Sequence, residues 1–312
     1  MSKIIVFGDT HIRTEEPFYS AIEDFFGWVH DQEWNNSDNY GIHVGDLFHS
    51  NSPTPKDYSV ANWALDGLML KKLHIMSGNG IHEYNRSKKM YAIDGLSERE
   101  NVHIIKKPME WVIEGINILF LPWVPSSMNN ISMKEYYSGY ETQQKPDYVF
   151  GHFAHRPFFD TEINVDHIPG KKRMGHIHIP TEEYVGVNVI SRYDEKGIDC
   201  SLIEIDTETL DEKRIPIPKF LDYATIEYGN VIDSIIEHYV IYDIVNAPSK
   251  EKAESEYSQY YIRNIYVKNS NDANDTDKSN DMENVSINGL FDSYAKQNNI
   301  SINIKKLIKK VI

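Results

Sequence analysis

Short runs of apolar residues alternate with longer segments of helical periodicity in the first part of the chain. The runs at 4–7, 42–44 and 73–76 each end at a glycine or a serine–glycine pair, as buried strands that lead into loops do. Between the first two runs, apolar residues recur at the spacing of one helix face: Phe18, Ile22, Phe25, Phe26 and Val29. This order predicts βαβ units, in which the ends of successive parallel strands meet at one edge of a sheet.

After residue 101 the predicted strands become shorter and follow one another more closely. Strands are predicted at 102–105, 111–113, 116–121, 148–150 and 173–174, and the apolar runs at 184–185 and 202–205 close the first domain. Glu114 and Gly115 are predicted to turn a hairpin between two of these strands. The pattern favours an α/β fold, with residues 1–213 forming a two-layer β-sandwich flanked by helices.

The segment Arg214–Pro218 contains two prolines, which interrupt a hydrogen-bonded run and indicate a domain boundary. We expect a small α+β domain at 214–267. Its strands are predicted from three apolar runs, at 224–228, 239–242 and 261–267.

The end of the chain changes composition twice. Residues 268–286 are rich in Asn, Asp and Ser and predict a flexible polar linker. Residues 287–312 predict a helical tail. One face of its last helix is apolar, with Ile304, Leu307, Ile308, Val311 and Ile312, and the opposite face carries Lys305, Lys306, Lys309 and Lys310. Such a tail could fold back on the parent domain or lie on a membrane, but its spacing favours docking on a partner protein.

Composition narrows the class of protein. The chain has 312 residues, of which 40% are hydrophobic, and a formal net charge of −15. No apolar stretch reaches the roughly 18 residues of a membrane span. The negative charge argues against nucleic-acid binding over the whole surface, although metal ions or a partner chain could add local positive charge. The single cysteine, Cys200, and a first strand without a leader sequence lead us to expect a cytoplasmic protein.

Five short motifs occur in order along the chain and carry most of its candidate chemistry. They are Asp9-Thr10-His11, Gly45-Asp46, Gly78-Asn79, Gly151-His152 and Gly175-His176-Ile177-His178. Each motif alone is weak, since Gly-Asp and Gly-Asn pairs commonly mark turns. Together they place carboxylate, amide and imidazole groups at predicted strand ends, as a pair of divalent cations requires. The ordered set predicts a two-metal phosphoesterase.

The spacing assigns these ligands to two cations. Asp9 and His11 alternate along an extended segment and can reach one cation, to which His178 is added. Asp46 has two carboxylate oxygens and is the natural bridge between the cations. The second cation takes three further ligands: Asn79, His152 and His176. We expect the cations to lie about 3.5–4 Å apart. Mixed oxygen and nitrogen ligands suit manganese, iron or zinc better than calcium, and magnesium stays open as an alternative.

The ordered motifs resemble those of the calcineurin-like metallophosphoesterases. Within that class the chain is similar to the SbcD (MRE-eleven) DNA-repair and recombination nuclease subunits, including their phage counterparts. The narrower resemblance covers roughly residues 1–230, and the rest only in layout. It rests on these segments: 45–50 followed by Pro53, 151–154, 175–180, 193–197 and 215–218.

The resemblance implies manganese-dependent DNA cleavage, with exonuclease activity on duplex ends and endonuclease activity on single strands. It implies a capping domain, a homodimer, and a C-terminal segment, here 290–312, that binds the coiled-coil base of an SbcC-type ATPase. It also implies the same metal ligands and places His49 near the DNA. A phage-encoded member would act in the host cytoplasm during DNA recombination, repair or replication.

One motif departs from the family pattern. The family reads Gly-Asn-His, with the histidine acting at the scissile phosphate or its leaving group, whereas this chain reads Gly78-Asn79-Gly80-Ile81-His82. In an extended segment two residues span about 6–7 Å, which is more than catalysis tolerates. We expect a loop excursion, eased by Gly80, to restore His82 to the site.

Two other functions stay open at this point. A phosphoesterase acting on a small molecule or a phosphoprotein would share the fold and the metals. A scaffold subunit, weakened in catalysis by the displacement of His82, would keep only the metals and the partner.

Overall fold

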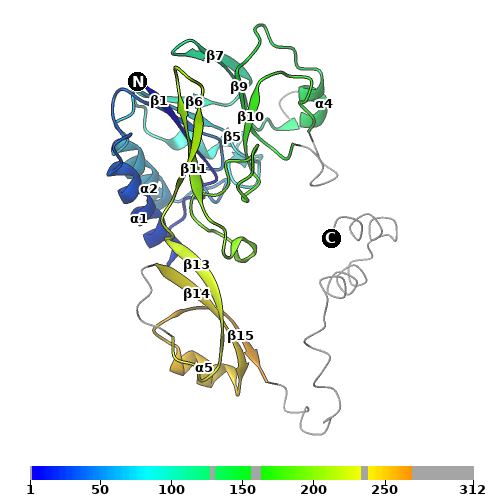
Figure 1. Ribbon diagram of the computed structural model, residues 1–312. Coiled ribbons are helices and arrows are strands. Elements are labelled where there is room, and N and C mark those ends of the chain that lie inside the picture. Colours follow the sequence, from blue (N-terminus) through cyan, green and yellow to red (C-terminus); the bar gives the residue numbers. More distant parts are fainter. Residues whose placement is uncertain (1, 127–130, 156–162, 233–237, 269–312) are drawn as a thin grey trace. The chain divides into compact units, whose positions relative to one another are not determined.

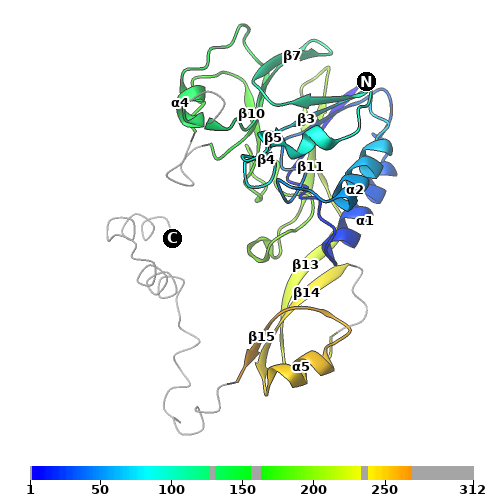
Figure 2. The ribbon, with the colours of Figure 1, turned by 180° about the vertical axis from the view of Figure 1, so that it is seen from behind.

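The computed structural model describes residues 2–126, 131–155, 163–232 and 238–268. The chain divides into two compact units, Met1–Tyr266 and Val267–Ile312. The tail predicted at 287–312, and the linker predicted at 268–286 apart from its first residue, lie outside the described residues. Figures 1 and 2 show the described elements from opposite sides.

The N-terminal apolar runs form the centre of a six-stranded sheet. Its order is β12 (Glu212–Pro216), β11 (Ser201–Asp206), β1 (Lys3–Phe7), β2 (Tyr40–His43), β3 (Lys72–Met76) and β6 (Val102–Ile105). Strands β1, β2, β3 and β6 run parallel, and β11 and β12 continue the sheet in antiparallel pairing. The predicted strands at 4–7, 73–76 and 102–105 are confirmed. The parallel order brings the C-terminal ends of β1, β2 and β3 to one edge.

A second sheet has four strands in the order β10 (Lys171–Gly175), β9 (Tyr148–His152), β8 (Ile116–Leu121) and β7 (Met109–Ile113). Strands β7 and β8 form the predicted hairpin, in which Glu114 and Gly115 have φ angles of 48° and 87°. Two positive φ angles match the turn whose twist suits a tight hairpin. Strands β8, β9 and β10 run parallel, so β9 and β10 also end at a common edge.

The two sheets pack face to face, with helices outside them (Figure 1). Buried side chains between the sheets include Val6, Val44 and Phe120. The helices α1 (Phe18–His30) and α2 (Pro55–Asp66) cover the outer face of the six-stranded sheet, and Phe25 and Phe26 of the predicted apolar stripe are buried there. Full burial of one such side chain contributes about 1.5–3 kcal/mol. The predicted sandwich flanked by helices is therefore observed.

Smaller elements lie in the loops and on the outer face of the four-stranded sheet. The helix α4 (Met133–Ser138) packs on that face through Tyr137. The remaining elements are β4 (Tyr84–Asn85), β5 (Met90–Tyr91) and two 3₁₀ helices, η1 (Ala92–Gly95) and η2 (Tyr193–Glu195).

The C-terminal described part is a small α+β layer, and its three strands overlap the three predicted apolar runs. It consists of β13 (Leu221–Glu227), β14 (Tyr239–Ala247), α5 (Lys250–Glu256) and β15 (Tyr261–Val267), with strand order β13-β14-β15. Strand β12 pairs with β11 as far as Pro216, so the six-stranded sheet runs past the boundary expected between residues 213 and 214. Among the helices that the structure describes, none combines the length and apolar character needed to cross a bilayer.

Candidate metal centre

The predicted ligands gather where parallel strands of both sheets end. Three of the motifs follow strands of the six-stranded sheet: Asp9 and His11 follow β1, Asp46 follows β2 and Asn79 follows β3. The other two belong to the four-stranded sheet, where His152 is the last residue of β9 and His176 and His178 follow β10. The sandwich thus brings residues from positions 9 to 178 to one place.

Asp9, His11 and His178 form the first cluster. Their candidate ligand atoms all lie within 4.8 Å of one another, and all three residues are buried. The Nε2 atoms of His11 and His178 are 3.0 Å apart, and His178 Nε2 is 3.7 Å from Asp9 Oδ1. Burial raises the pKa of Asp9 to about 6. A cation shared by the three groups would favour the ionised carboxylate and accept both imidazole lone pairs, so the donor set fits a metal ion.

Asp46, His152 and His176 form the second cluster, again with ligand atoms within 4.8 Å of one another. The Nδ1–H of His152 donates to the backbone oxygen of Val44 at 2.7 Å, which leaves Nε2 facing Asp46 Oδ2 at 3.2 Å. Burial opposes the charge on His152, but Asp46 raises the pKa of this histidine to about 9. Nε2 of His152 and Oδ2 of Asp46 therefore face one position, in which a metal ion would bind both groups.

Asn79 lies beside Asp46, but its amide is turned differently from the prediction. The Asn79 Nδ2 group donates to Asp46 Oδ2 at 2.7 Å, and the backbone N–H of Asn79 donates to Asp46 Oδ1 at 2.8 Å. Its Oδ1, the expected metal ligand, accepts from the N–H of Ile81 at 2.9 Å. A carboxylate accepts hydrogen bonds only, so it attracts the NH₂ side of the amide. Ligation through Oδ1 would require the amide to turn over.

The backbone at the ligands takes a conformation that side chains rarely adopt. The φ angles are 49° at Asp9, 51° at His11, 53° at Asp46 and 81° at His176. Left-handed φ is uncommon outside glycine and is several-fold enriched in Asp and His. Strain of this kind is concentrated at functional sites, where the surrounding structure holds it in place.

The glycines of the Gly-Asp and Gly-Asn motifs are required by close approach. A Cβ at Gly45 would collide with the ring of His152, and Gly45 also has a φ of 104°. A Cβ at Gly78 would collide with the carboxylate of Asp46. Both motifs therefore carry glycine because the ligands pack directly against the backbone.

The residues between Asn79 and His82 form a tight turn rather than an extended segment. The N–H groups of His82 and Glu83 donate to the backbone oxygen of Asn79 at 3.1 and 2.8 Å. Gly80 packs against Trp123, since a Cβ there would lie 2.7 Å from the indole ring. The two additional residues, Gly80 and Ile81, are thus accommodated in a turn, as was expected from the glycine.

This turn directs His82 back to the clusters. The His82 Nε2 atom is 4.0 Å from Asp46 Oδ2, and its ring centroid is 4.5 Å from that of His11. Its Nδ1 lies 2.6 Å from the backbone oxygen of His49. His11, His49 and His82 also have ligand atoms within 4.8 Å of one another. The structure therefore brings together both histidines that the family resemblance placed near the substrate.

Two buried glutamates support the ligands and were not predicted from the sequence. Glu83 accepts hydrogen bonds from the backbone N–H groups of Leu47 at 2.6 Å and Gly78 at 2.5 Å, and so ties the Gly-Asp loop to the Gly-Asn loop. Burial raises the pKa of Glu83 to about 8. The only signal in the sequence was its place directly after His82.

Glu195 supports His178 in a similar way. It accepts a short hydrogen bond from His178 Nδ1, and its carboxylate also accepts from the N–H groups of Ser191 at 2.6 Å and Arg192 at 3.0 Å. Burial opposes the charge on His178, but the hydrogen bond to Glu195 raises the pKa of the histidine. A carboxylate behind a ligating histidine fixes its tautomer and orientation. Glu195 lies in the segment 193–197, which resembles the corresponding segment of the SbcD family, but sequence analysis predicted no role for it.

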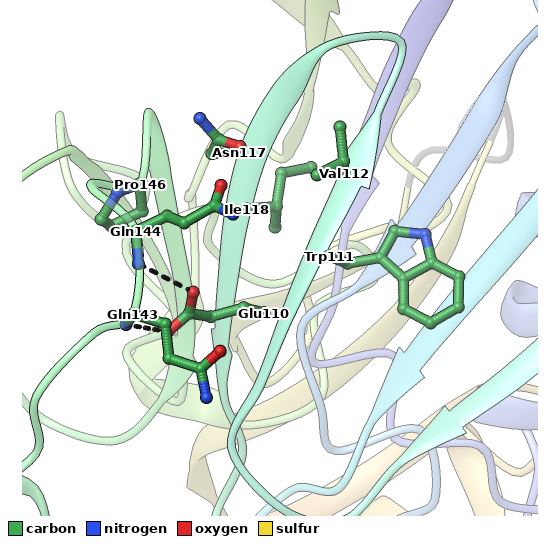
Figure 3. Close-up of a pocket in the computed structure, with 8 residues that line it drawn as sticks. All are labelled: Glu110, Trp111, Val112, Asn117, Ile118, Gln143, Gln144 and Pro146. Atoms are coloured by element: carbon green, nitrogen blue, oxygen red, sulfur yellow. Dashed lines mark hydrogen bonds between the residues drawn. The ribbon is translucent and has the colours of Figure 1, made fainter.

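A pocket of about 290 Å³ lies elsewhere, beside the edge strand β7 (Figure 3). Its polar side chain Glu110 accepts hydrogen bonds from the N–H groups of Gln143 at 2.7 Å and Gln144 at 3.2 Å. This carboxylate therefore anchors a loop, and none of the predicted site residues lines the pocket. The candidate chemistry lies at the strand ends.

Comparison with known proteins gives limited information. No protein-family model matches the sequence, and no curated protein matches it. Among solved structures, the chain is similar to one described as a novel archaeal phosphodiesterase, with a TM-score of 0.36 and 15% identity. The similarity covers 69% of this chain and 99% of that chain. The function is therefore inferred from the buried Asp and His clusters and their surroundings.

Proposed function

We propose that the chain is a metal-dependent phosphodiesterase and, more narrowly, a DNA nuclease of the SbcD type. The observation that carries the proposal is the convergence of two Asp–His clusters, whose ligands come from four of the five ordered motifs. Asn79, of the remaining motif, donates a hydrogen bond to Asp46. Carboxylate and imidazole groups at this spacing suit a pair of divalent cations of the manganese, iron or zinc kind. Manganese is the first choice, because the family resemblance implies it.

Two bound cations would supply the positive charge and water activation that phosphodiester hydrolysis needs. The first would be held by Asp9, His11 and His178, and the second by three further residues: Asn79, His152 and His176. Asp46 would bridge them. These side chains come from rigid strand ends, so their positions are largely set before substrate arrives.

His82 is the proposed proton donor to the departing oxygen. Its Nε2 carries no hydrogen bond to another described residue, whereas Nδ1 is held by the backbone oxygen of His49. The side chain is 20% exposed, so it can meet a substrate at the surface of the clusters. This position supports an active enzyme over a catalytically weakened scaffold.

The resemblance further supports a proposal about partners. An SbcC-type ATPase would bind the segment 290–312, and the protein would act as a homodimer. The net charge of −15 suggests that the ATPase provides much of the DNA affinity. The isolated protein should accordingly bind duplex DNA weakly, and tight binding that resists added salt would count against this division of labour.

The direct test is manganese-dependent cleavage of end-labelled linear duplex and single-stranded DNA. Wild-type protein should cleave, and Asp46→Ala, which lacks the bridging carboxylate, should not. Hydrolysis of nitrophenyl phosphates without any cleavage of DNA would instead favour a small-molecule or phosphoprotein phosphoesterase. Two bound metals with no cleavage, even with the ATPase added, would favour the scaffold.

A further inference from the structure

Arg13 places a half-buried cation at the edge of the metal centre. Its Nη1 lies 3.3 Å from His49 Nε2, and its Nη2 donates to the backbone oxygen of Ser191 at 2.6 Å. Its guanidinium carbon lies 3.2 Å from the centroid of the Phe18 ring. These contacts hold the guanidinium in one orientation.

No carboxylate of the described residues forms an ion pair with Arg13. A guanidinium has five N–H donors, and the described contacts of Arg13 use Nη1 and Nη2, while Nε is buried without a partner. A guanidinium keeps its positive charge at neutral pH. Buried charges in proteins are normally paired, because an unpaired one is costly. Glu15 and Glu195 act on the charge of Arg13 from a distance, but neither forms an ion pair with it, so its free N–H groups can bind an anion.

Two other arginines of the chain are paired with a carboxylate. Arg99 pairs with Asp66 at 2.7 Å, and Arg263 pairs with Asp243. Arg13 differs from both in standing beside a cluster of histidines rather than a carboxylate.

The position of Arg13 connects it to the candidate metal ligands. His49, which it contacts, has its ring centroid 5.9 Å from that of His11 and 5.5 Å from that of His82. His11 belongs to the first Asp–His cluster. Arg13 therefore stands one imidazole ring away from the place where a phosphate would be cleaved.

We propose that Arg13, positioned by its contact with His49, forms a subsite for a second phosphate group of the substrate. A guanidinium binds phosphate through two parallel N–H bonds and is the side chain best suited to that geometry. The inference rests on the proposed function and narrows it. The substrate carries a phosphate next to the one that is cleaved, as a polynucleotide does and a simple phosphate ester does not.

The test compares two nucleotides that differ by one phosphate: thymidine 5′-monophosphate and thymidine 3′,5′-bisphosphate. Each is titrated by calorimetry into the manganese-loaded, full-length protein. The wild type should bind the bisphosphate about tenfold or more tightly than the monophosphate, as a charge-assisted contact predicts. Arg13→Gln should bind the two with similar affinity. Arg99→Gln removes the same charge from an arginine already paired with Asp66 and should keep the preference.

Several results would overturn the subsite. These are equal affinities in the wild type, a preference retained in Arg13→Gln, or an equal loss for both nucleotides in that variant. An equal loss would mean that Arg13 only supports the loop at Ser191. If Arg13→Gln does not fold, Arg13→Lys keeps the charge without the fork and should show a reduced preference; an unchanged preference would count against the guanidinium.

DNA cleavage is scored separately from nucleotide binding. A wild type that prefers the bisphosphate but cleaves no DNA would retain the subsite and overturn the proposed nuclease. A wild type that cleaves DNA without this preference would retain the nuclease and overturn the subsite.

Discussion

At the scale of single residues, the candidate ligands could be predicted and their supports could not. Asp9, Asp46 and His152 stand out because each directly follows a glycine that comes at the end of an apolar run. Glu83 and Glu195 act through contacts with Gly78 and His178, which depend on how loops fold against each other. No local pattern distinguishes a buried supporting glutamate from a solvated one.

His82→Ala should lower the turnover of DNA cleavage by about 10²–10⁴-fold, the usual contribution of a positioned acid or base. Manganese affinity at the two Asp–His clusters should change little, because His82 belongs only to the separate group that it forms with His11 and His49. Steady-state kinetics with a metal titration of the same sample separates the two effects. Unchanged turnover would transfer the role to another group, of which His49 is the nearest candidate.

Glu195→Gln should weaken metal binding at the cluster of His178 by about 10–100-fold, the usual cost of losing such a support. Competition of manganese with a chelating dye measures this affinity without reference to catalysis. Glu204→Gln is the matched control, because Glu204 pairs with Lys3 at 2.9 Å and Lys213 at 3.0 Å on the six-stranded sheet. Equal affinity in wild type and Glu195→Gln would remove Glu195 from the centre.

At the scale of elements, apolar runs predicted the strands well because a strand buried on both faces leaves a continuous apolar stretch. The hairpin at Glu114 and Gly115 was also predicted correctly. The turn after Asn79 could not be derived in detail. The estimate from spacing assumed an extended backbone, whereas hydrogen bonds to the backbone oxygen of Asn79 fold this segment into a turn. The turn also packs Gly80 against Trp123, which is distant in sequence.

One strand contains a buried group that should make stability depend on pH. His74 of β3 is fully buried, and neither ring nitrogen has a hydrogen-bond partner among the described residues. Burial lowers its pKa from 6.5 to about 4. The unfolded chain therefore binds this proton at a higher pH than the folded chain does. The free energy of unfolding should fall as the pH drops from 6.5 towards 4.

Replacement of this histidine tests the sign. Between about pH 7 and about pH 5, His74 should account for a loss of about 2 kcal/mol in the free energy of unfolding. His74→Leu cannot take up the proton, so its stability should vary less over the same interval. Urea denaturation of metal-free wild type and variant at both pH values measures the difference. Parallel pH profiles would exclude His74 as the cause.

At the scale of the whole molecule, the described part contains a sandwich and a small α+β layer, while partner binding was predicted for the tail. The layer contacts the loop that holds Glu195: Tyr223 Oη donates to the backbone oxygen of Ser191 at 3.4 Å, and the Arg263 guanidinium lies 3.6 Å from the Tyr193 ring centroid. Sequence patterns predicted both parts as separate segments. They gave no sign of these contacts, which join residues far apart in the chain.

Removal of residues 287–312 should separate partner binding from catalysis. The truncated protein should bind manganese with wild-type affinity, since all candidate ligands lie between residues 9 and 178. Its binding to an SbcC-type ATPase should fall below detection in a pull-down with purified partner. Retained binding would locate the interface elsewhere, and loss of metal binding would show that the tail belongs to the catalytic unit.

The turn formed by Gly80 and Ile81 bears on how relatives of this chain can be found. These two residues displace His82 in the sequence, but the ring centroid of His82 is still 4.5 Å from that of His11. A search pattern that demands histidine directly after Gly-Asn scores this chain as lacking the residue. A pattern that permits two intervening positions, with glycine first, retrieves it. Distance between functional atoms, rather than residue count, is the quantity that such patterns should preserve.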